Sequence, residues 1–143
     1  MYMRRLAKEG FNIPTREVHK LLKAKGAFWR EWLLFDSRLL QVADELRATF
    51  GKCTVNDWFW GGQFNWSGFR TSEYEGSKLF SQHSHGRALD MKFGRNKLEK
   101  IQSKIIDDRL TWKEIKGLEK GEKVTWLHVD VRNSSRLMVF NIN

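Results

Sequence analysis

The segment SQHSHGRALD, residues 81–90, combines residue types that can bind a metal ion. His83 and Asp90 are suitable ligands, and Gly86 between them lets the chain double back because glycine tolerates backbone angles closed to other residues. Ala88 is small enough to leave room for an ion beside Asp90. A catalytic zinc ion takes three protein ligands and keeps a fourth position for water. The segment therefore predicts two ligands, and a third must come from elsewhere in the chain.

His128 is the best candidate for the third ligand. Residues 124–131 alternate in the manner of a β-strand. The polar face of this strand carries Trp126, His128 and Asp130, and the apolar face carries Thr125, Leu127, Val129 and Val131. A single histidine on a strand is more often a hydrogen-bonded structural residue than a ligand. The joint pattern of His83, Asp90 and His128 nevertheless predicts one metal site.

The same motif resembles the signature of a known group of enzymes. The pattern Ser-x-His-x-x-Gly-x-Ala-x-Asp at residues 81–90, followed by His128, is similar to that of the zinc D-alanyl-D-alanine carboxypeptidases and the phage L-alanyl-D-glutamate endolysins. The hedgehog signalling domain belongs to the same fold group. Gly-Phe-Arg-Thr at residues 68–71 resembles the Gly-aromatic-Arg-Ser/Thr element of that family. The resemblance extends over residues 35–132.

The resemblance implies a role for each matching residue. His83, Asp90 and His128 would bind Zn²⁺. Arg70 would hold the carbonyl oxygen or the carboxylate of the peptide substrate, unless it is an ordinary solvated charge. Ser81 would support the site by hydrogen bonding, or simply cap its loop.

Two further side chains are candidates for substrate contact. His85 is two residues from His83 and would share its side in an extended segment, so we expect it to line the site. Trp126 is a candidate for a groove that holds the peptide, although core packing is the ordinary role of a tryptophan. The same choice applies to Trp58, Trp60 and Trp66.

The general base departs from the family pattern. Many members carry Glu or Asp three residues before the last zinc histidine, where this chain has Thr125. Asp130 lies two residues after His128 on the same strand face, so it serves either as the base or as a carboxylate that orients His128. Glu119 and Glu122 are weaker candidates, and we expect both to be solvated charges.

The secondary structure must position these residues. Capping residues and apolar spacing predict three helices: one from Thr15 to a stop at Gly26, one from Asp36 or Ser37 to a stop at Gly51, and one over residues 96–107. Strands are expected over residues 53–58, in a short segment up to residue 70, over 88–93 and over 124–131. The expected fold is α+β, an antiparallel sheet with helices packed mainly on one face, similar to the hedgehog and D,D-peptidase fold. We expect one domain over residues 1–143, with a helical extension over 1–34 and a catalytic core over 35–143.

The composition limits the partners. The net charge of +9 on 143 residues favours an anionic partner such as nucleic acid, acidic lipid or the bacterial cell wall. No stretch approaches the roughly 20 apolar residues of a membrane span. The basic N-terminus lacks the apolar region of a secretory signal, and the lone Cys53 excludes an internal disulfide. For a phage protein of the kind that the resemblance implies, we expect a monomer that a holin releases from the host cytoplasm to the cell wall, or that a phage virion carries.

The resemblance, together with the expected zinc site, implies a zinc metallopeptidase that hydrolyses a peptide bond in the stem peptide of bacterial peptidoglycan. Its activity would be that of a D,D-carboxypeptidase or an L-alanyl-D-glutamate endopeptidase, in a phage lysin or a virion-associated wall hydrolase. One alternative keeps the fold and the zinc but is catalytically silent, as a wall-binding or virion structural module. A weaker alternative is a nucleic-acid-binding domain that uses basic and aromatic residues, which leaves residues 81–90 unexplained.

Overall fold

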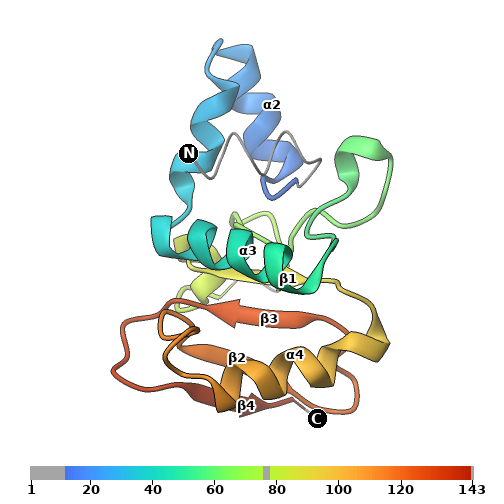
Figure 1. Ribbon diagram of the computed structural model, residues 1–143. Coiled ribbons are helices and arrows are strands. Elements are labelled where there is room, and N and C mark those ends of the chain that lie inside the picture. The colour runs from blue at the N-terminus through green and yellow to red at the C-terminus, as the bar shows by residue number, and fades with distance from the viewer. Residues whose placement is uncertain (1–11, 76–77, 143) are drawn as a thin grey trace.

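The computed structural model describes residues 12–75 and 78–142, and it confirms the α+β class (Figure 1). The helices are α2 (Arg16–Ala24), α3 (Ser37–Phe50) and α4 (Arg95–Asp107), and the strands are β1 (Ala88–Met91), β2 (Gly117–Lys120), β3 (Leu127–Asp130) and β4 (Met138–Asn141). Three short 3-10 helices are η1 (Phe28–Leu34), η2 (Trp58–Trp60) and η3 (Gln82–His85). None of these described helices has the length and apolar character needed to cross a membrane.

The sheet is mixed, so the prediction of an antiparallel sheet was wrong for one strand pair. The strand order is β1-β3-β2-β4. β3 is antiparallel to both β1 and β2, whereas β2 and β4 are parallel. β3 lies between β1 and β2, so both of its edges are occupied and β4 pairs with the free edge of β2. β2 and β4 both run opposite to β3, and they are therefore parallel to each other.

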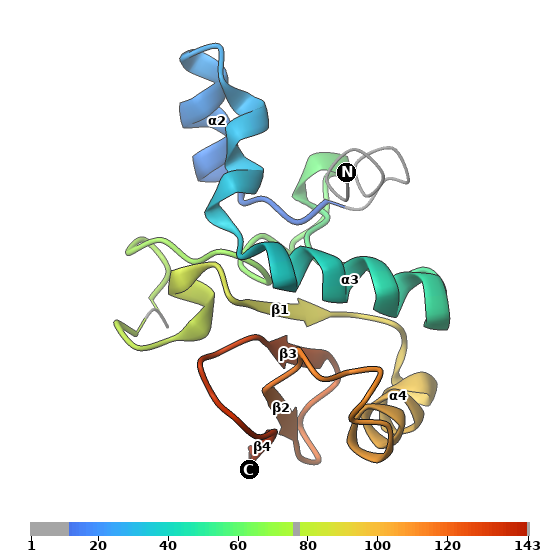
Figure 2. The same ribbon diagram turned by 60° about the vertical axis from the view of Figure 1, so that its left-hand side comes forward.

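The hydrophobic core lies between the sheet and the helices α3 and α4, which cover the same face (Figures 1 and 2). The predicted boundaries of α3 are confirmed: the Asp36 carboxylate accepts a hydrogen bond from the Arg38 backbone N–H, and the helix ends at Gly51. The predicted inner face of α4 is also confirmed. The helices contribute Leu39, Leu40, Leu46, Leu98, Ile101 and Ile105 to the core, and β1 and β3 contribute Leu89, Met91, Leu127 and Val129.

The N-terminal part projects from the sheet but is anchored in the same core (Figure 1). Helix α2 begins after Thr15 as predicted and buries none of its residues. The segments on either side of α2 are buried instead, since Ile13 and Trp32 both belong to the core cluster. The side-chain amide of Asn56 also donates a hydrogen bond of 2.6 Å to the Ile13 carbonyl. The core therefore extends across the boundary expected at residues 34 and 35.

The strand predicted over residues 53–58 is absent. Thr54 forms a single isolated bridge with Lys92. The next backbone groups have other partners, because the Asn56 N–H donates to the carbonyl of residue 12 and the Asp57 N–H donates to the carbonyl of Phe64. The segment up to residue 70, also predicted to be a strand, is likewise irregular. Hydrogen bonds to loop residues thus take the place of the strand pairing that the β-branched residues of this segment had suggested.

The strand predicted over residues 124–131 is shorter than expected. It forms only at Leu127–Asp130, because the Val124 N–H donates a hydrogen bond to the Gly121 carbonyl and so belongs to a turn. Thr125 is exposed instead of facing the core. The predicted faces hold within the strand that does form, with Leu127 in the core and His128 on the opposite side.

Candidate metal centre

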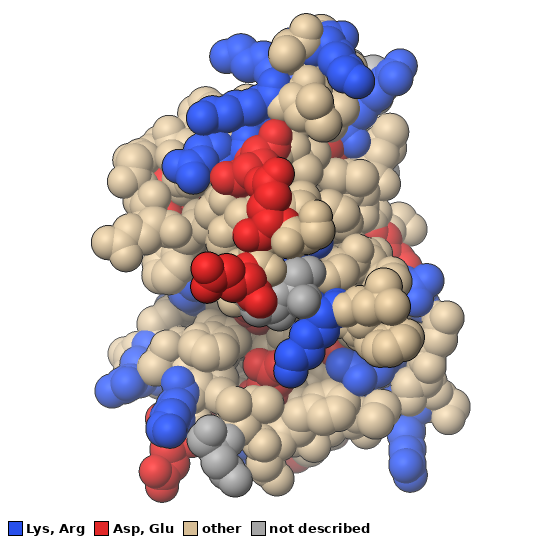
Figure 3. All heavy atoms as spheres, turned by 180° about the vertical axis from the view of Figure 1, so that it is seen from behind, with Lys and Arg blue, Asp and Glu red and all other residues tan. Residues whose placement is uncertain are grey.

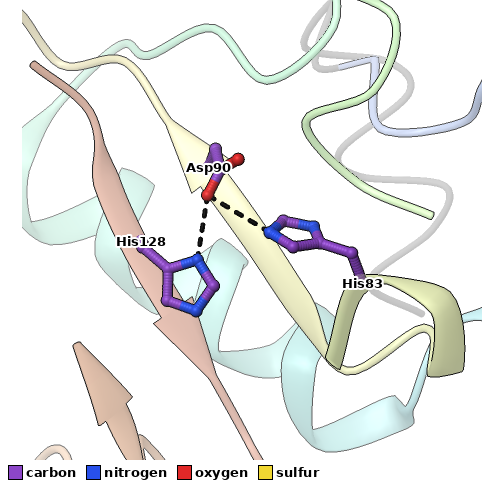
Figure 4. Close-up of side chains that lie close together, drawn as sticks. All are labelled: His83, Asp90 and His128. Atoms are coloured by element: carbon purple, nitrogen blue, oxygen red, sulfur yellow. Dashed lines mark hydrogen bonds and ion pairs between the residues drawn. The ribbon is translucent and has the colours of Figure 1, made fainter. Parts of the chain in front are cut away.

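The structure brings the three predicted metal ligands together (Figure 4). One ligand atom each from His83, Asp90 and His128 can be chosen so that all lie within 4.8 Å of one another. Asp90 Oδ1 lies 3.3 Å from His83 Nε2 and 3.0 Å from His128 Nδ1. His83 and His128 are buried, and so is Asp90. This group could hold one metal ion.

Two strands and a tight turn position these ligands. Asp90 of β1 is the register partner of His128 of β3, and directly opposed residues of antiparallel strands share a face. His83 lies in η3, which ends at Gly86 in the left-handed conformation, with φ +66°. A Cβ atom at Gly86 would lie 1.8 Å from the Leu34 carbonyl oxygen, so only glycine fits. This confirms that Gly86 lets the chain turn from His83 to Asp90.

Each histidine has a second contact that leaves one ring nitrogen for the metal. His83 Nδ1 donates a hydrogen bond of 2.8 Å to the Gly68 carbonyl, so Nε2 points toward Asp90. His128 has the opposite arrangement: its Nε2 lies 3.2 Å from Asp130 Oδ2, and its Nδ1 points toward Asp90. Such outer contacts fix the tautomer and orientation of metal-binding histidines.

Asp130 is held away from the cavity. Its exposed fraction is 0%. Both carboxylate oxygens are engaged, since Oδ1 accepts a hydrogen bond of 2.8 Å from Arg132 Nε and Oδ2 contacts Arg132 Nη2 as well as His128 Nε2. Its cross-strand neighbours are Ala88 and Gly117, the two small residues paired with it in β1 and β2. This placement suits the carboxylate that orients His128 better than a base that meets substrate.

Ala88 lies opposite Asp130 in the sheet. Its small side chain is expected to leave room for an ion, and the structure shows that it is fully buried with Asp130 as its register partner. Gly117 lies on the other side of Asp130, and a Cβ atom there would lie 2.1 Å from Asp130 Oδ2. The two residues without bulk allow a buried carboxylate to fit within the sheet.

The charges in the site support one another. Burial raises the pKa of Asp90, but the charge of His83 and the hydrogen bond from His128 outweigh burial and hold this pKa well below its usual range. Burial lowers the pKa of His128, but hydrogen bonds to Asp130 and Asp90 outweigh it and raise the pKa to about 9. Burial also raises the pKa of Asp130, and the contacts with Arg132 and His128 reverse this and lower it to about 2. The site thus favours ionised carboxylates and a positive charge between them.

Arg70 contacts the ligand carboxylate directly. Its Nη2 donates a hydrogen bond of 2.9 Å to Asp90 Oδ2, the oxygen that faces away from the two imidazoles. Its Nε donates to the Trp66 carbonyl at 2.8 Å, and its guanidinium lies 4.7 Å from the centre of the Tyr74 ring. Arg70 also lines a cavity next to the ligands, so it could contact a substrate there as the sequence predicts.

The ligands open into a cavity of about 370 Å³. Among its lining residues are Ser81 and Trp126, both singled out in the sequence, and the basic residues Lys78 and Arg132. Seen from behind, this side of the molecule is hollowed, with acidic atoms inside the hollow and Lys or Arg side chains at its edge (Figure 3). The side chain of Ser81 makes no capping hydrogen bond to η3.

His85 lies outside the cavity, contrary to expectation. Its side chain is exposed, and its Nε2 lies 3.0 Å from the Leu79 carbonyl oxygen, to which it can donate a hydrogen bond. The expectation assumed an extended chain, in which residues two apart share a side. Residues 82–85 instead form a 3-10 turn, which points His83 and His85 in different directions.

The site contains two residues, Glu119 and Arg132, for which the sequence predicted no role in the site. Glu119 lines the cavity, and its Oε1 lies 3.9 Å from His128 Nδ1, although a solvated charge was expected. The pairing of β2 with β3 through a short turn brings it there. Arg132 was not considered, but it lies two residues after Asp130, and side chains two apart on an extended chain point the same way.

Comparison of the chain with models of known protein families, with curated proteins and with solved structures found no match. The donor set itself is informative. Two imidazole nitrogens and one carboxylate oxygen suit zinc, and three ligands leave a coordination position for water or substrate. The residues present therefore fit a catalytic metal site, whereas a structural zinc site would need a fourth protein ligand.

Proposed function

We propose that the protein is a zinc metallopeptidase that hydrolyses a peptide bond in the stem peptide of peptidoglycan, in a phage lysin or a virion-associated wall hydrolase. The bond would be that of a D,D-carboxypeptidase or of an L-alanyl-D-glutamate endopeptidase. One observation supports this most strongly: His83 and Asp90 of one segment converge with the distant His128, and all three line the same cavity. The likeness of residues 81–90 and His128 to the peptidase motif supplies the reaction.

The residues of the chain divide the work. A bound zinc ion would supply a water molecule with a pKa of about 7 and polarise the scissile carbonyl. His83, Asp90 and His128 would hold it, while Gly68 and Asp130 fix the two imidazoles through their outer nitrogens. A three-ligand site of this composition also accepts iron(II), so metal analysis must accompany activity measurements.

The cavity suits a peptide that carries carboxylates. Its lining includes the cations Arg70, Lys78 and Arg132 and the aromatic rings of Tyr74 and Trp126. Arg70 is close enough to the ligand carboxylate to stabilise negative charge that develops on a substrate oxygen held at the metal. The net charge of +9 gives the whole chain affinity for an anionic polymer such as the cell wall.

One observation favours the silent alternative, a zinc-binding module without activity. The family's acidic residue is replaced by Thr125, whose side chain is exposed. Asp130 does not take over its position, because it is buried against Arg132. The peptidase proposal therefore needs another proton acceptor in the cavity.

Digestion of purified peptidoglycan tests the proposal. Wild-type protein is incubated with the polymer, and the soluble fragments are identified by mass spectrometry, which also identifies the bond that is cut. Asp90→Ala and chelator-treated wild type should release no fragments, and His85→Ala, which alters an exposed histidine outside the cavity, should release the wild-type set. Intact peptidoglycan after incubation with zinc-loaded wild type would refute the peptidase and favour the silent module.

A further inference from the structure

Three neighbouring strands present a row of polar side chains to the cavity. Asp90 of β1 is the register partner of His128 of β3. On the other side of β3, Leu118 of β2 pairs with Val129, and the same register brings the next residue of β2, Glu119, opposite His128. Directly opposed residues of antiparallel strands share a face. Asp90, His128 and Glu119 therefore point to the same side of the sheet.

Glu119 reaches the ligand site without being one of the ligands. Its Oε1 lies 3.9 Å from His128 Nδ1, the ring nitrogen that also faces Asp90. It does not belong to the three-residue group that can surround one ion. Its side chain is 26% exposed and lines the cavity, so it is accessible to water and substrate. A carboxylate that acts on water beside a metal needs this combination of proximity and access.

The other acidic candidates lack one of these properties. Asp130 has no exposed surface, and its oxygens contact Arg132 and His128. Glu122 lies in the exposed turn between β2 and β3 and does not line the cavity. Of the three acids weighed from the sequence, Glu119 alone meets the cavity.

We propose that Glu119 is the general base of this peptidase, an inference that rests on the proposed function. Its carboxylate accepts a proton from the attacking water while the water oxygen bonds to the carbonyl carbon. The peptide C–N bond then breaks, and Glu119 returns the proton to the leaving amine, so the products are a carboxylate fragment and an amine fragment. Glu119 on the adjacent strand thus takes over the task of the acid that is missing at Thr125.

The variant Glu119→Gln tests this role, because glutamine keeps the size of the side chain but does not accept the proton. Turnover of the peptidoglycan fragment that wild type cuts should fall by about 10²–10⁴-fold, the usual contribution of a general base. Zinc content should stay at the wild-type level. Native mass spectrometry should detect the uncut fragment bound to Glu119→Gln, because binding is retained and cleavage is lost. Glu122→Gln is the matched control and should behave as wild type.

The possible outcomes separate the two proposals. Wild-type turnover by Glu119→Gln, or loss of the uncut fragment's binding, would overturn the role of Glu119 and leave the peptidase proposal intact. Loss of zinc from Glu119→Gln would make Glu119 a ligand and would also overturn it. A zinc-loaded wild type that binds the fragments but cuts none would refute the peptidase and the base together.

Discussion

His128 Nε2 lies 3.2 Å from Asp130 Oδ2, so a carboxylate holds the imidazole on the side opposite the candidate metal. Asp130 is itself fixed by Arg132. Replacing it with asparagine keeps its size but removes the charge that orients and strengthens the histidine. Asp130→Asn should therefore bind zinc about 10–100-fold more weakly, the usual effect of losing such a contact. Competition with a chromophoric chelator measures the affinity.

A matched control separates this effect from a general loss of acidic charge. Asp107→Asn changes an exposed residue at the end of α4 and should bind zinc as wild type does. Wild-type zinc affinity in Asp130→Asn would show that the buried carboxylate does not support His128.

Arg70 offers a second test of the outer contacts. Its Nη2 donates to Asp90 Oδ2 at 2.9 Å, so Arg70→Met should weaken zinc binding by about 10–100-fold as well as slow turnover. Arg136→Met, in an exposed segment, is the control. An Arg70→Met protein with unchanged zinc affinity and a raised KM would assign Arg70 to substrate binding alone.

Zinc affinity should depend on pH through His128. Hydrogen bonds to Asp130 and Asp90 outweigh burial and raise the pKa of His128 to about 9 in the metal-free protein. Because this pKa is raised, the proton stabilises the metal-free fold fully below about pH 6.5, the unfolded value. That contribution is lost as the pH rises through about 9. Zinc must displace the same proton.

The expected result is an affinity that falls by about tenfold for each pH unit below 9 while one proton is displaced. Zinc titrations from pH 9 to pH 6 measure it, and a pH indicator in weak buffer detects the released proton at pH 7. Constant affinity across this range, with no proton release, would contradict His128 as a ligand.

Gly117 tests the packing that accommodates Asp130. A Cβ atom at this position would lie 2.1 Å from Asp130 Oδ2, and both residues are buried. Gly117→Ala should lower the free energy of unfolding by about 1–3 kcal/mol, the usual cost of inserting an extra methyl group into a packed core. It should also weaken zinc binding, because it displaces the carboxylate that holds His128. Urea denaturation measures the first effect. Gly26→Ala, where no atom lies within 4 Å, should keep wild-type zinc affinity.

The parts of the fold that the sequence predicted well are those with strong local signals. The boundaries of α3 follow from Asp36 and Gly51, and the inner face of α4 follows from apolar residues at helical spacing. The three candidate ligands were also found from residue types and spacing. Gly86 was correctly assigned to the turn between two of them, because its positive φ and close approach to the backbone exclude other residues.

The errors arose where nonlocal contacts decide the structure. Residues 53–58 had strand composition, but their backbone groups pair with the N-terminal segment and with Phe64. The parallel pairing of β4 depends on the edge that β2 leaves free, which no local pattern encodes. Glu119 was undervalued for the same reason: its place beside His128 depends on strand register, whereas its neighbours in sequence suggested only a solvated loop.

The most direct test of the metal centre is the metal content of purified protein, measured by elemental analysis in wild type and in four alanine variants. Wild type and His85→Ala should contain about one zinc per chain, as expected for one three-ligand site. His83→Ala, Asp90→Ala and His128→Ala should lose the metal while circular dichroism shows that they remain folded. A folded His128→Ala protein that keeps a full equivalent of zinc would contradict the proposed site.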